Sequence, residues 1–498
     1  MNFRVTRSGR AFSPWEADPI SSPSFDIATA VIHAVEAAVD DDLVEPNASD
    51  VDFDSRQENP SLSGTDASNT SIHASNVAPA SSSSASPTPR GAHDKAGSKR
   101  RHAAARQAGK VREHLALLPP ARRPQHIKNA GPPVETRFNL MKERVASTGW
   151  IGLRDDGQSM QEESAGFEEP GWTPTHTLPD ILGQKLDPLP TQREESLACL
   201  ADILTTPTAR PITDATGRVF GLSGGHPDDP TWMAEVHDAA VEALEAACAR
   251  CKVSEARTYH RHGNFAPLTA GDSYGGGQME PGALVNGVIN AAVLCSLMSN
   301  LAFICLAGFA TGEYLTSKGL FVNWSPRLFD YYASRMRCFY KWYTHLQRPF
   351  LNSIWSACTF NLGPRTCCIG HRDFGNLAFG WCSITALGDY DYTKGGHLIL
   401  WDCGLVLEFP PGTTIIIPST AVFHSNIPIS VGEQRYSFTQ YTSGGIFRWI
   451  EHGFQSEEAY FASLSPEERV KEREEARARW EGGASLFCTL DELKSGSI

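Results

Sequence analysis

The chain lacks the features that mark secreted and membrane-spanning proteins. Its twelve cysteines follow no regular spacing, which argues against the disulfide framework of a small secreted domain. No apolar signal core follows Met1, and the uncharged run from Leu284 to Gly312 is interrupted by Asn and Ser and has no flanking basic cluster. We therefore expect an intracellular protein with no membrane partner. The uncharged run should form a buried core helix, or two helices that meet near Asn300.

Two common chemical motifs are also missing. Cys248-Ala-Arg-Cys251 has no second cysteine pair at zinc-ribbon distance, and Tyr274-Gly275-Gly276-Gly277-Gln278 lacks the Lys-Ser/Thr ending of a phosphate loop. Cys367-Cys368 lies close to a possible metal-ligand motif, His371-Arg372-Asp373, but thiolates would oppose chemistry that needs hard ligands. We interpret all four cysteines as packing residues.

The N-terminal part has a composition unlike that of the rest of the 498 residues. From about Asp40 to Lys99 it is dominated by Ser, Ala, Pro, Asn and Asp, so it buries too little apolar surface to offset the entropy of ordering, and we predict disorder. The net charge of -13 argues against a chain that coats nucleic acid along its whole length. Yet the stretch from Arg90 to Lys128, which includes Lys99-Arg100-Arg101, holds eleven Lys or Arg against two acidic residues. It is either a nuclear localisation signal, a flexible nucleic-acid contact or a solvated linker.

Beyond this arm, the patterns predict helices first and strands second. Helical spacing begins near Asp228-Asp229-Pro230 and recurs from Pro326 to Leu351, and Ser465-Pro466-Glu467-Glu468 combines a capping box with a proline at the first helical position. Six short strands are predicted at Thr359–Leu362, Trp381–Leu387, His397–Trp401, Leu405–Phe409, Thr413–Ile417 and Arg435–Tyr441. We expect an α+β fold in which supporting helices precede an antiparallel jelly roll.

The expected organisation has five parts. They are a disordered, then basic arm (1–130), a Pro/Gly-rich wrapping segment (131–218), a helical support and substrate-side region (219–345), the jelly-roll core (346–455), and a charged C-terminal helix and tail (456–498).

Three residues of the predicted core could bind a metal. In an extended chain, His371 and Asp373 project from the same face, because side chains alternate along a strand. His424 follows after several predicted strands, which is enough chain to return across a small barrel. Two imidazoles and one carboxylate on one face of an octahedron leave three positions open, as non-haem iron(II) oxygenases require.

A second pair suits a dicarboxylic acid. Arg435 and Ser437 lie two residues apart on one predicted strand, so a guanidinium and a hydroxyl share a face and can hold a distal carboxylate. Taken alone, Arg435 would more often be part of a surface salt bridge. Its position shortly after His424 is what favours a cosubstrate site.

Together these residues resemble the 2-oxoglutarate dioxygenase superfamily, whose pattern is His-x-Asp, a distal His and then Arg-x-Ser. Gly395-Gly396-His397-Leu398 and Pro411-Gly412 also look like family features. The resemblance implies a double-stranded β-helix, with iron(II) held by His371, Asp373 and His424, 2-oxoglutarate held by Arg435 and Ser437, and dioxygen as the second cosubstrate. His397 occupies the variable position of its motif, and strand alternation predicts that it points away from the metal.

More narrowly, Asn376-Leu-Ala-Phe-Gly-Trp-Cys and Arg435-Tyr-Ser-Phe-Thr-Gln-Tyr441 resemble a fungal, transposon-linked group related to the ten-eleven translocation and J-binding proteins. The likeness runs from about Phe220 to Leu493. It implies oxidation of the methyl group of a modified pyrimidine, 5-methylcytosine or thymine, in DNA, and a nuclear protein. A base extruded from a duplex needs aromatic and amide contacts, for which Asn376, Trp381 and Tyr274 are candidates beside a packing or turn-forming role. The long Cys-rich zinc module of the animal members has no counterpart here.

Three classes of function follow. The first is a DNA-base dioxygenase, the second a 2-oxoglutarate-dependent hydroxylase of a protein side chain or small molecule, and the third an inactive jelly roll kept as a binding module. The third is disfavoured because all three metal ligands and the arginine are present. The basic arm and the group resemblance favour DNA over the second class.

Overall fold

The computed structural model of the chain describes residues 4–5, 11–12, 127–143, 149–152, 198–199, 208–312 and 319–497. The chain divides into two compact units, Met1–Glu45 and Pro46–Ile498. In the first, β1 (Arg4–Val5) pairs antiparallel with β2 (Ala11–Phe12). Most of the predicted disordered and basic arm, including Lys99-Arg100-Arg101, lies outside the described residues.

Two β-sheets form the centre of the second unit. Among the described residues, the larger sheet has the strand order β10-β9-β11-β17-β12-β15-β6-β5-β3, and it is mixed because only β3 and β5 run parallel. The strands of this sheet are β3 (Val134–Glu135), β5 (Arg210–Thr213), β6 (Val219–Gly225), β9 (Ala266–Ser273), β10 (Gly282–Ala283), β11 (Ala357–Leu362), β12 (Cys382–Asp389), β15 (Thr414–Ile417) and β17 (Gln434–Tyr441). The second sheet has the order β16-β13-β14-β4, made of β4 (Ala198–Cys199), β13 (Leu398–Leu400), β14 (Leu405–Leu407) and β16 (His424–Asn426).

From β11 onward the chain alternates between the two sheets. After β11 it makes a bridge from His371 to β16 of the second sheet, and β12 then returns to the larger sheet. Strands β13 and β14 belong to the second sheet, β15 to the larger, β16 to the second and β17 to the larger. The fold is therefore α+β, with an arrangement consistent with a jelly-roll-like core.

The second sheet has one face in the main core and one face outside it. Leu398, Leu400, Leu405 and Leu407 are buried members of the main core, which also includes the larger sheet. The residues between them, Ile399 and Val406, form a separate small cluster with Ile427. This alternation means that the inward faces of the two sheets share one core, as strand geometry requires.

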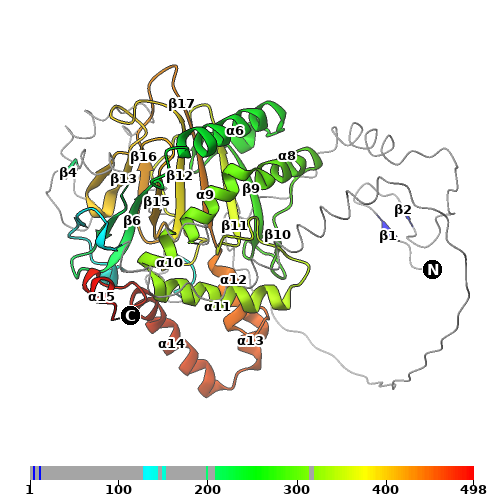
Figure 1. Cartoon of the computed structure of the whole chain (residues 1–498). Coiled ribbons are helices and arrows are strands. Elements are labelled where there is room, and N and C mark those ends of the chain that lie inside the picture. The colour runs from blue at the N-terminus through cyan, green and yellow to red at the C-terminus, as the bar shows by residue number, and fades with distance from the viewer. Residues whose placement is uncertain are drawn as a thin grey trace, which may run out of the picture. The chain divides into compact units, whose positions relative to one another are not determined.

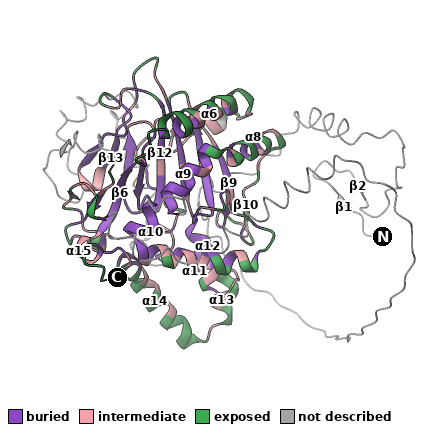
Figure 2. Cartoon of the chain, viewed as in Figure 1, coloured by how far each residue is buried: buried purple, intermediate pink, exposed green. Residues whose placement is uncertain are grey.

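Helices cover the larger sheet and extend to the C-terminus (Figure 1). The described helices are η3 (Leu140–Lys142), the π-helical η4 (Trp232–Asp238), α6 (Ala239–Arg250), α7 (Glu255–Thr258), α8 (Val288–Ser299), α9 (Leu301–Thr311), α10 (Leu320–Trp324), α11 (Pro326–Trp342), η5 (Trp401–Cys403), which joins β13 to β14, α12 (Gly444–Glu451), α13 (Glu457–Ser463), α14 (Pro466–Ala484) and α15 (Leu490–Ser495). Helix α6 contacts β11 and β12, α8 contacts β9, and α10 contacts β6. Figure 2 shows buried strands, with exposed residues gathered on α14 and on the outer turns of α6.

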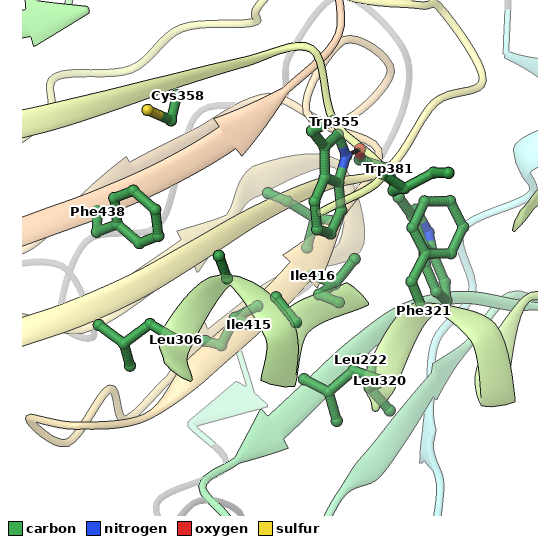
Figure 3. Close-up of a cluster of buried hydrophobic side chains, with 14 of the residues drawn as sticks. Leu222, Leu306, Leu320, Phe321, Trp355, Cys358, Trp381, Ile415, Ile416 and Phe438 are labelled. Atoms are coloured by element: carbon green, nitrogen blue, oxygen red, sulfur yellow. Dashed lines mark hydrogen bonds between the residues drawn. The ribbon is translucent and has the colours of Figure 1, made fainter. Parts of the chain in front are cut away.

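The core between helices and sheet is apolar and aromatic (Figure 3). Leu306 of α9 and Phe321 of α10 lie against strand residues that include Ile415 and Ile416 of β15. Phe303 of α9 makes an edge contact with Phe438 of β17, their ring centroids 5.3 Å apart. One face of β17 therefore packs on the helices, which leaves its other face for the second sheet.

The uncharged run forms two helices, as expected. Helices α8 and α9 meet at Asn300, whose side chain caps α9 by accepting a hydrogen bond of 2.8 Å from the backbone N–H of Ala302. No single helix among the described residues is long and apolar enough to span a membrane. The two helices, bent by 66°, pass that test of length and composition only as a pair.

Several predicted elements differ from the observed ones. The six predicted strands correspond to β11 to β15 and β17, and the capping box at Ser465 begins α14, as expected. The helix predicted to reach Leu351 instead ends at Trp342. Pro349 disfavours helical backbone at Arg348, and the buried Leu346 and Phe350 reach the core from the irregular segment after the helix. Strands β6 and β9 join the larger sheet from a region expected to be helical, and β5 joins it from the predicted wrapping segment.

Candidate metal and cosubstrate site

The residues predicted to bind a metal lie close together where the chain crosses between the two sheets. His371 and His424 face one another across an antiparallel bridge, in which each backbone N–H donates to the other residue's carbonyl over 3.0 Å. The backbone N–H of Asp373 donates to the carbonyl of Ser419, also over 3.0 Å. Backbone pairing therefore fixes the spacing of the three side chains.

Both imidazoles are oriented by their own backbone. The Nδ1 of His371 lies 2.8 Å from the carbonyl oxygen of Ile369, and the Nδ1 of His424 lies 2.9 Å from that of Val422. Because a carbonyl can only accept, each Nδ1 carries the proton and each Nε2 keeps its lone pair. Such an outer hydrogen bond is typical of metal-binding histidines.

The carboxylate lies beside these rings. Asp373 Oδ1 is 3.6 Å from His371 Nε2, and the His371 and His424 ring centroids are 4.3 Å apart with planes inclined at 50°. Burial and, to a smaller extent, the neighbouring His424 lower the pKa of His371 to about 3. Burial acts to raise the pKa of Asp373, but His371, His424 and Arg261 outweigh it, so that this pKa is lowered. Neutral imidazole next to ionised carboxylate is the state that a metal needs.

A third imidazole, which the sequence analysis did not identify, lies at the same place. His262, His371 and Asp373 offer ligand atoms that all lie within 4.8 Å of one another. His262 comes from a small hairpin of β7 (Tyr259–His260) and β8 (Gly263–Asn264), and its ring stacks on that of His371 with centroids 4.3 Å apart. No motif spacing signalled it, because only the path of the hairpin brings it to the site.

Arg435 lies deep in the protein without a carboxylate partner. Its exposure is 1 %, and Nη1 donates to the carbonyl of Thr366 over 2.8 Å. Nε and Nη2 are buried and make no hydrogen bond, and no described acidic side chain forms an ion pair with Arg435. The surface salt bridge considered for an isolated arginine is therefore not what the structure has.

The surroundings of Arg435 locate it between the sheets. Arg435 and Ser437 lie on the face of β17 opposite Phe438, which packs on α9. The guanidinium carbon is 5.8 Å from the ring centroid of Phe409, which follows β14 of the second sheet. Ser437 accepts a hydrogen bond of 2.9 Å from Asn361 Nδ2, so the hydroxyl that was predicted beside Arg435 is present and held in place.

The three predicted substrate residues lie in different environments. Asn376 is partly buried, and its amide donates to Ser419 Oγ over 3.4 Å, close to Asp373. Trp381 is a correction, since it is 1 % exposed in the core beside Phe321 and its Nε1 donates to the carbonyl of Phe220 over 2.7 Å (Figure 3). Trp381 therefore packs the core and cannot reach a substrate.

Tyr274 also packs rather than faces the metal residues. Its ring contacts that of Trp449 on α12 edge-on, at a centroid distance of 4.8 Å. Its backbone carbonyl accepts a hydrogen bond of 2.7 Å from Ser443. The packing alternative thus describes Tyr274 better than a substrate contact.

The cysteines near the site are thiols. Burial raises the pKa of Cys367 to about 11 and that of Cys368 to about 12, with Arg435 opposing both shifts. Burial also raises the pKa of Cys248 to about 11. Protonated, half-buried or buried thiols agree with the packing interpretation and do not compete for a hard metal ion.

His397 gives the first prediction, on pH dependence. It is 1 % exposed, and burial lowers its pKa to about 4. In the unfolded chain this histidine binds a proton below about pH 6.5, whereas in the folded chain it does so only below about pH 4. The unfolding free energy therefore falls as the pH falls from about 6.5 to about 4. Between pH 7 and pH 5, the unfolding free energy of the wild type should fall by about 2 kcal/mol more than that of His397→Phe, as measured by urea titration at each pH. Equal losses would contradict the assignment.

Comparisons with known proteins add little to this site. No protein-family model matches the chain, and no curated protein matches it. Among solved structures, "NgTET1 in complex with 5mC DNA" is similar at a TM-score of 0.32 and 15 % identity, over 48 % of this chain and 78 % of that one. At so low a TM-score the two folds are not equated and nothing is transferred from one to the other. The resemblance to the fungal group stays a prediction.

Proposed function

We propose that the chain is an iron(II)- and 2-oxoglutarate-dependent dioxygenase that oxidises the methyl group of a modified pyrimidine in DNA. The observation that carries the enzyme class is Arg435, a buried cation with two unpartnered nitrogens on the inner face of β17. A buried charge is costly unless it is paired, and none of the described residues pairs with these two nitrogens, so this site favours binding of an anion. The alternation of the chain between two sheets further supports a double-stranded β-helix.

The metal residues suit iron(II). His371, His424 and Asp373 offer two imidazole nitrogens and one hard oxygen, the donor set of non-haem iron oxygenases. Iron(II) bound there would couple the oxidative decarboxylation of 2-oxoglutarate by dioxygen to hydroxylation of a substrate C–H bond. In the balanced reaction one oxygen atom enters the substrate and the other enters succinate, and carbon dioxide is released.

The chain's own residues supply position and environment. Arg435 and Ser437 would hold the distal carboxylate of 2-oxoglutarate by charge-assisted hydrogen bonds. The backbone bonds of His371 and His424 fix their tautomers, so that no ring rotation is needed when the metal binds. Burial of Arg435 and of both imidazoles keeps water from the reacting groups.

DNA as the substrate is supported by the sequence. The likeness to pyrimidine-oxidising proteins and the basic stretch from Arg90 to Lys128 both favour it, and the same stretch supports a nuclear location. Asn376, beside Asp373, remains the candidate contact to an extruded base. A hydroxylase of protein side chains or small molecules is the alternative outcome.

The test is a paired assay of the two products. With iron(II), ascorbate and 2-oxoglutarate, the purified chain should release succinate and convert 5-methylcytosine in a duplex oligonucleotide to oxidised bases, measured by mass spectrometry of the digested DNA. Succinate release without any change in a DNA base would refute the DNA substrate and leave the dioxygenase class standing. No succinate and no base change would support the inactive binding module.

A further inference from the structure

The β7–β8 hairpin is held by backbone contacts against the segment that leads to His371 and Asp373. The backbone N–H of Ile369 donates to the carbonyl of His262 over 2.9 Å, and Gly263 pairs with Cys368. A Cβ on Gly263 would lie 2.4 Å from the carbonyl oxygen of Cys367, so glycine permits this close approach. The hairpin thus holds His262 at the site through backbone contacts.

Exposure of the side chains shows from which side the site is reached. The side chains of His262 and Asp373 are each 22 % exposed, against 6 % for His371. Arg435, at 1 %, lies deepest. Arg435, the proposed partner of 2-oxoglutarate, is therefore at the inner end of the site. A substrate would approach between His262 and Asp373.

The ring geometry argues against His262 as a fourth metal ligand. An imidazole binds a metal in the plane of its ring, and the planes of His262 and His371 are stacked at an angle of only 20°. One ion cannot lie in two stacked, nearly parallel planes, whereas the 50° between His371 and His424 lets their planes converge. A fourth protein ligand would also leave too few positions for 2-oxoglutarate and dioxygen.

His262 nevertheless has an unused polar atom at the entrance. Its Nε2 is buried and makes no hydrogen bond, and it lies 4.0 Å from Asp373 Oδ1, too far for one. Leaving a buried polar atom unpaired is unfavourable. A molecule that brings a hydrogen-bonding atom between His262 and Asp373 would remove that cost.

We propose that His262 is a positioning residue for the substrate, whose polar edge its Nε2 hydrogen-bonds while the methyl group is held beside the metal. This inference rests on the proposed function and specifies its substrate class. The substrate must carry a nitrogen or oxygen acceptor or donor near the oxidised methyl, as a pyrimidine base does. Arg261, whose guanidinium lies 4.7 Å from the Phe374 ring centroid, adds positive charge at the same entrance.

Two substitutions separate the polar role of His262 from its packing role. His262→Phe keeps a ring to stack on His371 but removes the nitrogen, whereas His262→Gln keeps a polar end. With a 5-methylcytosine duplex, we expect the ratio of oxidised base to succinate to fall about tenfold in His262→Phe and to recover partly in His262→Gln, the effect of one lost hydrogen bond. The dissociation constant for Co²⁺, titrated without cosubstrates, should change in both by less than the roughly 10-fold that loss of an outer partner of a metal ligand causes.

Tyr259→Ala is the matched control. Tyr259 lies on the same hairpin with an exposure of 62 % and should leave both measurements unchanged. An unchanged product ratio in His262→Phe would overturn the positioning role, and Co²⁺ affinity that falls as far as in Asp373→Ala would make His262 a metal ligand instead. A wild-type chain that does not oxidise the duplex overturns the proposed function itself, before any variant is compared.

Discussion

Asp373→Ala should abolish succinate release and leave the protein folded. Asp373 supplies the negative charge beside His371 and His424, and its removal leaves the two imidazole nitrogens to hold a divalent ion. Loss of an outer partner of a metal ligand already weakens metal binding about 10- to 100-fold, so loss of the ligand itself should exceed about 100-fold. Co²⁺ titration and a succinate assay measure the two effects.

The fold should tolerate this change. Asp373 holds its place through its backbone N–H to Ser419, which alanine retains. The midpoint of thermal unfolding without metal should therefore move by less than about 4 °C. Asp389→Ala, which removes an exposed carboxylate at the end of β12, is the control and should keep both metal binding and turnover. Succinate release at the wild-type rate by Asp373→Ala would exclude this residue from the reaction.

The parts of the site that could be predicted are those that local strand geometry fixes. Side chains two residues apart in an extended segment lie on the same face. This rule predicted the pairing of His371 with Asp373 and of Arg435 with Ser437. The return of His424 required only that the intervening strands close a small barrel. The two pairings used spacing within one extended segment, for which local sequence is sufficient.

The parts that failed depend on long-range packing. Trp381 precedes β12 and looked available to a substrate, but α10 packs Phe321 against it and Phe220 accepts its N–H, neither of which its neighbours in sequence reveal. His262 reaches the metal residues because its hairpin makes a bridge to Cys368, which precedes His371. In the same way β6 and β9 joined the larger sheet from a region expected to support the core with helices.

The effect of Arg435→Met on the unfolding free energy should show whether Arg435 binds the cosubstrate or stabilises the fold. If the guanidinium binds 2-oxoglutarate, the protein free of 2-oxoglutarate carries a buried, unpaired charge. Methionine, of similar length, should then leave the unfolding free energy within about 1 kcal/mol of wild type or raise it. The same change should weaken binding of 2-oxoglutarate to the Co²⁺-loaded protein by about 100-fold or more, since a truncated buried charge pair costs about 2–5 kcal/mol.

Arg372→Met, a substitution between His371 and Asp373, should have the opposite effect on stability. Arg372 forms a buried ion pair with Asp402, 2.9 Å away, and its removal leaves that carboxylate without the cation. This variant should lose about 3–5 kcal/mol of unfolding free energy. The ligand provides the second contrast, because 2-oxoglutarate at 100 times its dissociation constant should stabilise the wild type by about 2.7 kcal/mol and Arg435→Met hardly at all. An Arg435→Met protein as unstable as Arg372→Met, yet still stabilised by 2-oxoglutarate, would make Arg435 a structural residue and remove the main support for the dioxygenase.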